Sequence, residues 1–434
     1  MQKISGSKTI HEILLSDLKP GAEVNFSCCV HKIRDMGVFS FIILRTGKYI
    51  LQSVYDGKSC VKPMDGLCEG AYINITGTVK EEKRALYGIE ILLADFEILS
   101  LPAAQYPLHV SNRVLDCSLD TNMEYRSVAL RHPLERAVFK ISEGVVSGFR
   151  EYMIKEGFTE IHTPKIVSAG AEGGANIFKL KYFDKDAYLA QSPQFYKQTC
   201  VAFFDRVFEV APVYRAEKHN STRHLNEYIG LDFEMAFIRD MSDVMETETA
   251  MLKYVVDYLK AGYEHELKLL GAELPEIGEI PSLTFFEALD VLGKAHNQFD
   301  LDPTDEVRLC KYAKEEFDSD FIFITKFPAS KRPFYAMNSK DDDKLAESFD
   351  LLFRGLEITT GGQRIHDYGE QLEKLKKYNI EPEELGAYLD IHKYGMPPHG
   401  GLGIGLERLV MKLLNLQNIR QASLFPRDIH HLDP

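Results

Sequence analysis

A run of alternating glycines near the C-terminus constrains the fold of this chain more than any other feature. Residues 401–408 read Gly-Leu-Gly-Ile-Gly-Leu-Glu-Arg. Alternate residues of a strand share a face, and glycines there let a flat ligand approach the backbone. Arg408 follows at a strand-to-helix junction, where a guanidinium can stack on an adenine or pair with a phosphate. The alternative is a glycine-rich turn before an ordinary helix, but the spacing fits neither a Rossmann fingerprint nor a P-loop.

A second pattern is a pair of strands joined by a charged loop. Residues 214–217 read Tyr-Arg-Ala-Glu, and a polar loop leads from there to a second strand with Leu-Asp-Phe-Glu at 231–234. Because side chains alternate along a strand, Arg215 and Glu217 share one face. There they could hold the α-phosphate and the adenine amino group of a nucleotide. Surface ion pairing across the hairpin is the alternative.

The remaining sequence divides into a strand-rich part and a mixed part. Residues 1–105 contain about five short strands with glycines at the turns, which predicts a small β-barrel of the oligonucleotide-binding (OB) type. Residues 106–130 lose this period and are expected to form a linker. From 131 to 434, strands mix with helices, which predicts an α+β domain with a mainly antiparallel sheet flanked by helices. A smaller insertion is expected at about 265–335.

Composition excludes several classes of protein. The 434 residues are 45% apolar and 27% charged, which is enough for buried cores. The absence of a membrane-spanning run or a signal-peptide pattern predicts a cytoplasmic protein without a membrane partner. The seven cysteines are scattered without a CxxC pair, so zinc binding and disulfides are not expected. The net charge of −14 is unusual for a nucleic-acid binder, although a local basic groove can coexist with it.

Three segments, in chain order, carry a family resemblance. Residues 157–164 (Gly-Phe-Thr-Glu-Ile-His-Thr-Pro), the hairpin at 214–234 and the glycine run at 401–408 resemble motifs 1, 2 and 3 of class II aminoacyl-tRNA synthetases. Shorter runs, among them Ser-Pro-Gln-Phe-Tyr-Lys-Gln at 192–198 and Gly-Gly-Gln-Arg-Ile-His-Asp at 361–367, resemble aspartyl-tRNA synthetases of the archaeal and eukaryotic cytoplasmic type. The resemblance covers nearly the whole chain. It implies an aspartate–tRNA ligase that activates L-aspartate with ATP and Mg²⁺ and transfers it to the 3′ end of tRNA(Asp).

The resemblance implies a pocket for aspartate. Its residues would be Glu172, Gln194, Lys197, Arg215, Asp232, Thr360 and Arg364. Physical chemistry favours the same substrate, because the planar fork of Arg364 suits the side-chain carboxylate and Lys197 adds a second positive charge. An asparagine pocket would need an acceptor for the amide, and a buried unpaired cation opposite a neutral amide is heavily penalised.

The resemblance also implies an ATP site. Arg215 would contact the α-phosphate, and the other nucleotide contacts would come from Glu217, Arg223, His224, Leu225, Glu357, Gly405, Leu406, Glu407 and Arg408. Glu357 and Thr360 would bind Mg²⁺, with Asp232 and Glu234 as nearby oxygen ligands, although the family usually has serine in place of Thr360. The substrate carboxylate is itself the nucleophile, so Arg215 and Arg408 are expected to be catalytic by neutralising charge.

For the tRNA, the resemblance implies that the barrel holds the anticodon. Phe41 would stack on a base and Gln52 would hydrogen-bond to one, whereas core packing beside Phe39 and Ile43 is the alternative for Phe41. The segment that ends at Pro164 implies a homodimer. An asparaginyl-tRNA synthetase and a catalytically silent paralogue that binds RNA remain alternative functions. Charging of tRNA(Asn) with aspartate is also left open.

Overall fold

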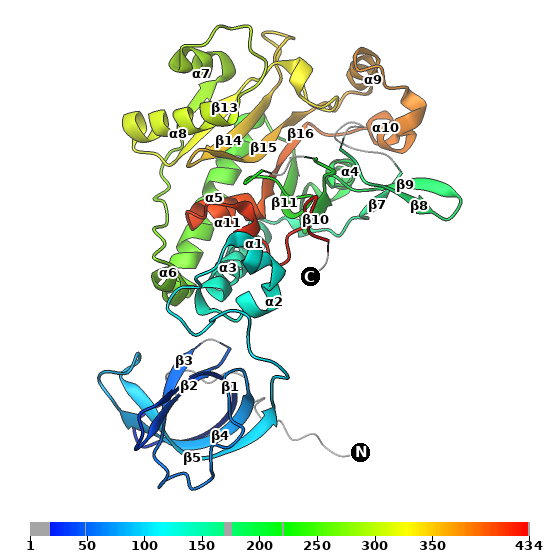
Figure 1. The fold of residues 1–434 in the computed structure, drawn as a ribbon. Coiled ribbons are helices and arrows are strands. Elements are labelled where there is room, and N and C mark those ends of the chain that lie inside the picture. Colours follow the sequence, from blue (N-terminus) through cyan, green and yellow to red (C-terminus); the bar gives the residue numbers. More distant parts are fainter. Residues whose placement is uncertain (1–17, 48, 169–175, 219–220, 433–434) are drawn as a thin grey trace. The chain divides into compact units, whose positions relative to one another are not determined.

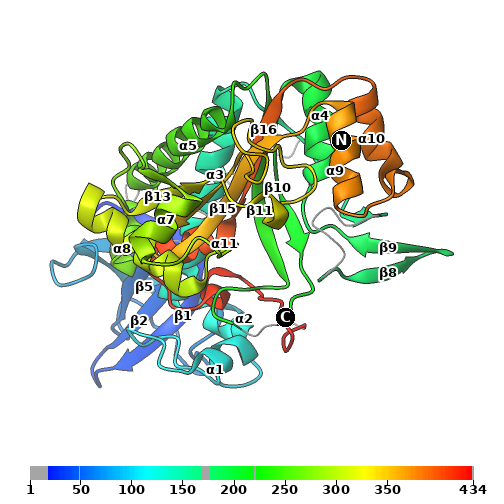
Figure 2. The same cartoon turned by 90° about the horizontal axis from the view of Figure 1, so that it is seen from above.

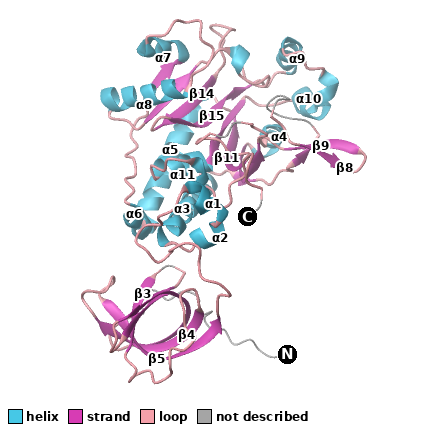
Figure 3. Cartoon of the chain, viewed as in Figure 1, coloured by secondary structure: helices cyan, strands magenta, loops and turns pink. Residues whose placement is uncertain are grey.

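The chain folds into two compact units, which divide between His132 and Pro133. The computed structural model describes residues 18–47, 49–168, 176–218 and 221–432. Strands dominate the first unit, whereas the second mixes strands with helices (Figures 1 and 3). Within these described ranges, no helix combines the length and the apolar character needed to cross a membrane.

The first unit is a closed five-stranded barrel in the order β1-β2-β3-β5-β4. Its elements are β1 (Glu23–Asp35), β2 (Ser40–Arg45), β3 (Ile50–Tyr55), β4 (Tyr72–Glu81) and β5 (Ile89–Ser100), followed by α1 (Leu119–Glu124) and α2 (Arg126–Ala129). The period of two in the sequence appears as alternating burial along β2. Ile42 and Leu44 lie in the barrel core, and Phe41 and Ile43 are half-buried on the opposite face of the strand. The expected OB-type barrel is therefore confirmed.

The second unit is built on an eight-stranded sheet in the order β12-β13-β14-β15-β16-β11-β10-β6. The five central strand pairs are antiparallel, and the two edge pairs are parallel. The strands are β6 (Thr159–Glu160), β10 (Arg206–Tyr214), β11 (Glu227–Ala236), β12 (Ser282–Thr284), β13 (Phe321–Thr325), β14 (Ser348–Phe353), β15 (Leu356–Arg364) and β16 (His399–Gly405). The expected α+β domain on a mainly antiparallel sheet is confirmed.

Three helices pack on one face of this sheet, α3 (Pro133–Lys155), α5 (Met241–Gly262) and α11 (Leu406–Leu413). Figures 1 and 2 show α3 and α5 side by side against it. Because strand residues alternate, Phe233 and its cross-strand partner Leu402 face this helical core, whereas Asp232 and its partner Gly403 face the opposite side. The sheet thus separates an apolar face from a polar face.

The remaining elements are β7 (Ile166–Val167), β8 (Lys179–Tyr182), β9 (Lys185–Leu189), α4 (Gln194–Phe204), α6 (Glu264–Leu270), α7 (Phe285–Leu292), α8 (Pro303–Phe317), η2 (Ala329–Lys331), α9 (Tyr368–Lys377), η3 (Pro382–Leu385), α10 (Gly386–Lys393) and η4 (Ile419–Ala422). Of these, α6 and η4 pack with α3 on the apolar side of the sheet. The β8–β9 hairpin extends away from the sheet (Figure 2). The region predicted as an insertion adds β12 and β13 to the main sheet, and α7 and α8 pack on them through a separate apolar cluster.

Candidate active site

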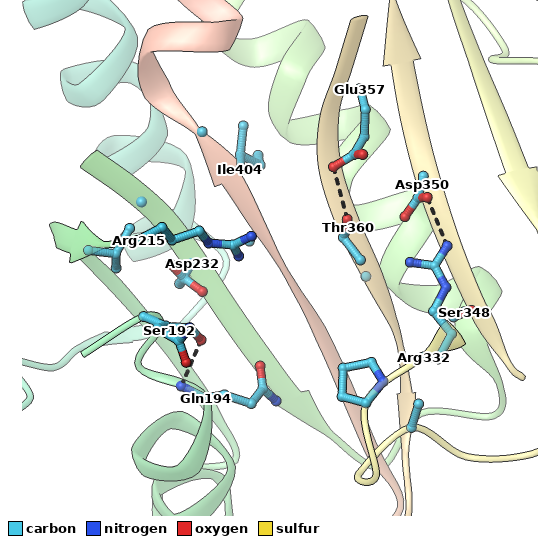
Figure 4. A pocket seen from close by; sticks show the side chains of 18 of the residues that line it. Ser192, Gln194, Arg215, Asp232, Arg332, Ser348, Asp350, Glu357, Thr360 and Ile404 are labelled. Atoms are coloured by element: carbon cyan, nitrogen blue, oxygen red, sulfur yellow. Dashed lines mark hydrogen bonds and ion pairs between the residues drawn. The ribbon is translucent and has the colours of Figure 1, made fainter. Parts of the chain in front are cut away.

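The polar face of the sheet lines a cleft of about 680 Å³, which also reaches α4 and the loop after β13. In Figure 4, Arg215 and Asp232 lie on one side of the cleft, and Glu357 and Asp350 lie on the other. The predicted site residues that line it are Gln194, Lys197, Arg215, Glu217, Arg223, His224, Leu225, Asp232, Glu357, Thr360, Arg364, Gly405, Glu407 and Arg408. Two other residues were predicted in the cleft. Leu406, the first residue of α11, packs instead in the helical core on the apolar face of the sheet. Glu172 lies outside the described residues.

Two buried cations and two buried carboxylates form one end of the site. Lys197 Nζ donates to Asp232 Oδ1 at 2.9 Å and to the Leu402 carbonyl at 2.8 Å, and it lies 3.4 Å from Glu234 Oε2. Arg364 donates from Nε to Glu234 Oε1 and from Nη2 to the Gly401 carbonyl, both at 2.9 Å. Both cations are therefore paired within the protein, because strand alternation places both acids of β11 beside them.

Burial and neighbouring charge act in opposite directions on these two acids. Burial alone would raise the pKa of Glu234, but the charges of Arg364 and Lys197 prevail and hold this pKa below its ordinary value. In Asp232, burial prevails over the attraction of Lys197 and raises the pKa. Glu234 is therefore the ionised partner that fixes Arg364, whose guanidinium lies 5.5 Å from the ring centre of Tyr335.

The same acids explain most of the glycine alternation. A Cβ at Gly401 would lie 2.2 Å from the Glu234 carboxylate, and one at Gly403 would lie 3.0 Å from Asp232 Oδ1. The space that the sequence assigned to a flat ligand is thus filled at Gly401 by a side chain of the neighbouring strand. Gly403 and Gly405 line the cleft and leave its wall smooth there.

Arg408 and Glu407, in the first turn of α11, have different roles. Arg408 Nη1 donates to the Glu357 carbonyl at 2.9 Å and lies 3.5 Å from the Glu357 carboxylate. The Glu407 carboxylate accepts the backbone N–H of Ile229 at 3.1 Å, and its burial raises its pKa to about 7. Arg408 therefore faces the cleft, whereas Glu407 ties α11 to β11.

Asp350 and Arg332 also line the cleft, although the sequence did not single them out. Arg332 Nη2 donates to Asp350 Oδ2 at 2.8 Å, and burial raises the pKa of Asp350 to about 6 against the opposing charge of Arg332. Asp350 is the one charged residue within the apolar strand 348–353, which is a signal that could have identified it.

The residues around Glu357 fit a magnesium ion. Thr360 Oγ1 donates to Glu357 Oε1 at 3.2 Å, and Asp350 pairs with Thr360 across the strands. Two carboxylates and a hydroxyl are hard oxygen ligands of the kind that Mg²⁺ combines with substrate phosphates and water. No group of three His, Cys, Asp or Glu suited to a metal occurs in the described parts of the chain, so substrate oxygens would have to complete the site. Asp232 and Glu234, which the sequence placed near the metal, pair with Lys197 and Arg364.

A model of the family "tRNA synthetases class II (D, K and N)" matches residues 118–429. The chain belongs to this family. This class II synthetase is 45% identical over 429 residues to the aspartate–tRNA(Asp/Asn) ligase of Thermus thermophilus, with 97% of the chain and 100% of the relative covered. It is 40% identical over 424 residues to the aspartate–tRNA(Asp) ligase of Pyrococcus furiosus, with 95% and 97% covered.

Solved structures share the whole fold of this class II synthetase. An asparaginyl-tRNA synthetase from Pyrococcus horikoshii, complexed with asparaginyl-adenylate, has a TM-score of 0.90 at 29% identity and covers 98% of this chain and 100% of its own. An aspartyl-tRNA synthetase from Entamoeba histolytica has a TM-score of 0.88 at 29% identity and covers 100% and 95%. The class II fold is thereby confirmed, but the backbone alone does not separate aspartate from asparagine.

Proposed function

We propose that this class II synthetase is an aspartate–tRNA ligase, which activates L-aspartate with ATP and transfers it to the 3′-terminal ribose of tRNA(Asp). The observation that carries the proposal is the convergence of four cationic side chains from separate segments on one cleft, namely Lys197, Arg215, Arg364 and Arg408. A dicarboxylic amino acid and a polyphosphate both require such groups. The names of the relatives at 40–45% identity agree with this substrate.

The aspartate pocket would use Arg364 and Lys197 for the side-chain carboxylate. Both are held in place by acids of β11, so fixed donor positions, and not an excess of positive charge, would select the substrate. Gln194 is buried and its Nε2 has no hydrogen-bond partner among the described residues, so its amide can bind the substrate. Glu172 remains a proposed partner of the substrate ammonium.

An asparagine-specific enzyme is the main alternative. The NH₂ group of an asparagine substrate would face N–H donors of Arg364 and Lys197, so a donor would meet donors, and a hydrogen-bond mismatch of this kind in a buried site can reject a ligand by a factor of roughly 10⁴. A catalytically silent paralogue is disfavoured because the arginines of the cleft and Glu357 are all in place.

ATP would bind at the other end of the cleft. Arg215 would contact the α-phosphate, and Arg223 and Arg408 would contact the outer phosphates, since all three guanidinium side chains line this cleft. Glu357 and Thr360, together with Asp350, would hold Mg²⁺, which supplies positive charge to the phosphate oxygens when it is bound.

The reaction then needs placement and charge neutralisation. The α-carboxylate of aspartate attacks the α-phosphorus in line, Arg215 stabilises the charge on the α-phosphate, and pyrophosphate leaves. The nucleophile is already ionised, so no catalytic base is needed. The 3′-terminal ribose hydroxyl of the tRNA then attacks the carbonyl carbon of the aspartyl adenylate, which forms the ester and releases AMP.

The OB barrel would hold the anticodon. Phe41 lies outside the barrel core, with its ring edge-to-face against Phe39 at 5.1 Å, which supports base stacking over the core-packing alternative. Gln52 lies on the adjacent strand, paired with Ile43, and its Nε2 donates to Glu90 at 3.0 Å. This bond fixes the Gln52 amide, and the half-buried ring of Phe41 offers a face on which a base can stack.

A homodimer would cover an exposed aromatic patch formed by Phe203, Phe204 and Phe237, whose exposed fractions are 62%, 46% and 71%. Their segments adjoin, because the Ala236 N–H donates to the Asp205 carbonyl at 2.7 Å. Such clustered apolar surface marks an interface. We expect Phe237→Asp to shift the sedimentation coefficient from dimer to monomer, and an unchanged coefficient would reject this interface.

The substrates of an aspartate–tRNA ligase would place this enzyme in the cytoplasm.

Amino-acid-dependent exchange of pyrophosphate into ATP tests the proposal without tRNA. We expect exchange with aspartate and negligible exchange with asparagine. Exchange with asparagine alone would overturn the substrate assignment, and exchange with neither would favour the silent paralogue.

A further inference from the structure

Helix α8 carries a buried carboxylate that contacts Arg223, a residue that lines the cleft. Glu306 is 6% exposed, and its two oxygens each lie 2.6 Å from Arg223 Nη2. Glu306 Oε2 also accepts the backbone N–H of Glu357 at 2.8 Å. One carboxylate therefore connects an arginine of the hairpin loop with the strand that carries the expected metal ligand.

We propose that Glu306 is a positioning residue that sets the placement of Arg223 relative to Glu357 for ATP and magnesium. The inference rests on the proposed function, which assigns the nucleotide to Arg223 and the metal to Glu357. A guanidinium on a long side chain has many rotamers in solution, and a charge-assisted pair with a buried acid restricts it before the nucleotide arrives.

The backbone beside Arg223 is held independently of Glu306. The Ile419 N–H donates to the Thr222 carbonyl at 2.9 Å, and Arg420 Nη1 donates to the Ser221 carbonyl at 3.3 Å. Both donors belong to η4. Loss of the Glu306 charge should therefore release the Arg223 guanidinium and leave the end of the hairpin in place.

A purely structural role, in which the ion pair only anchors α8, is the competing interpretation. The preceding residue offers a matched control for it. Asp305 is 2% exposed, pairs with Lys294 at 2.6 Å and completes the capping box at Asp302. It therefore stabilises the N-terminal end of the same helix through partners other than Arg223. Removing the Asp305 charge should weaken α8 and leave the nucleotide contacts intact.

The test compares E306Q, E306D and D305N with the wild type in aspartate-dependent pyrophosphate exchange, with a thermal melt of each protein. We expect E306Q to raise KM for ATP on the order of ten-fold, with KM for aspartate unchanged, because a charge-assisted bond to Arg223 is lost. The Mg²⁺ concentration for half-maximal rate should rise with it. E306D keeps the charge with a shorter reach and should lie between E306Q and the wild type, whereas D305N should lower Tm and leave KM for ATP unchanged.

The inference is overturned if KM for ATP stays within about two-fold of wild type in folded E306Q, or if the KM values for ATP and aspartate rise together. E306D decides the question by the same criteria if E306Q does not fold. Absence of aspartate-dependent exchange in the wild type would reject the proposed function instead, so the two failures are distinguishable.

Discussion

Replacing Arg364 with lysine separates geometry from charge in the proposed aspartate pocket. The guanidinium is fixed by two bonds of 2.9 Å, to Glu234 and to the Gly401 carbonyl. A lysine keeps the positive charge but cannot make both bonds and still offer a planar fork to the substrate. Loss of one hydrogen bond to a charged group costs about 1.5–3 kcal/mol, so kcat/KM for aspartate should fall about ten- to hundred-fold.

Pyrophosphate exchange at saturating ATP, with aspartate varied, measures this loss. KM for ATP should not change, and Tm should fall little because Glu234 retains a cationic partner. Arg354→Lys is the matched control, since Arg354 pairs with Asp320 at 2.8 Å and does not line the cleft. Arg364 does not act through its geometry if R364K retains the kcat/KM of the wild type, or if R354K loses as much.

Three further outcomes follow from the structure. Glu357→Gln should raise the Mg²⁺ concentration for half-maximal exchange, because an ionised oxygen ligand is lost, and a titration in which the midpoint stays constant would contradict this. Phe41→Ala should lower kcat/KM for tRNA charging by about five- to 150-fold, since base stacking is worth ~1–3 kcal/mol, while exchange without tRNA stays normal; equal loss in both assays would point to misfolding. Glu248 is fully buried beside the Thr359 hydroxyl, and burial raises its pKa from 4.5 to about 8. Between these pH values the folded state holds a proton that the unfolded state lacks, so the free energy of unfolding should fall as pH rises through this window. Urea denaturation at about pH 5 and about pH 8 should show a smaller fall in Glu248→Gln than in the wild type, and equal falls would count against the shifted pKa.

Local patterns were sufficient to predict much of the fold. The period of two at 40–45 predicted a barrel strand, and the apolar stripe through Ile141, Val145 and Phe149 predicted α3, because both patterns depend on residues near in sequence. The placement of β12 and β13 on the main sheet could not be predicted in this way. It depends on strand pairing between segments with no sequence pattern in common.

Sequence motifs predicted only those site residues whose spacing along the chain is recognisable. Arg215, Arg364 and Arg408 stand in motifs with recognisable spacing, and the structure brings all three to one cleft. Glu306 stands in no such motif, and only the packing of α8 shows that it reaches Arg223. Likewise, the pairing of Lys197 with Asp232 depends on the crossing of α4 over β11, which no spacing along the chain encodes.

Aminoacylation of tRNA transcripts distinguishes an aspartate–tRNA ligase from an asparagine-specific enzyme and from a silent paralogue. Transcripts with GUC and GUU anticodons are each offered labelled aspartate or asparagine, and acid-precipitable charging is measured. We expect aspartate on the GUC transcript, and charging of the GUU transcript decides whether tRNA(Asn) is also a substrate. Asparagine on either transcript without any aspartate, or no charging at all, would overturn the assignment as an aspartate–tRNA ligase.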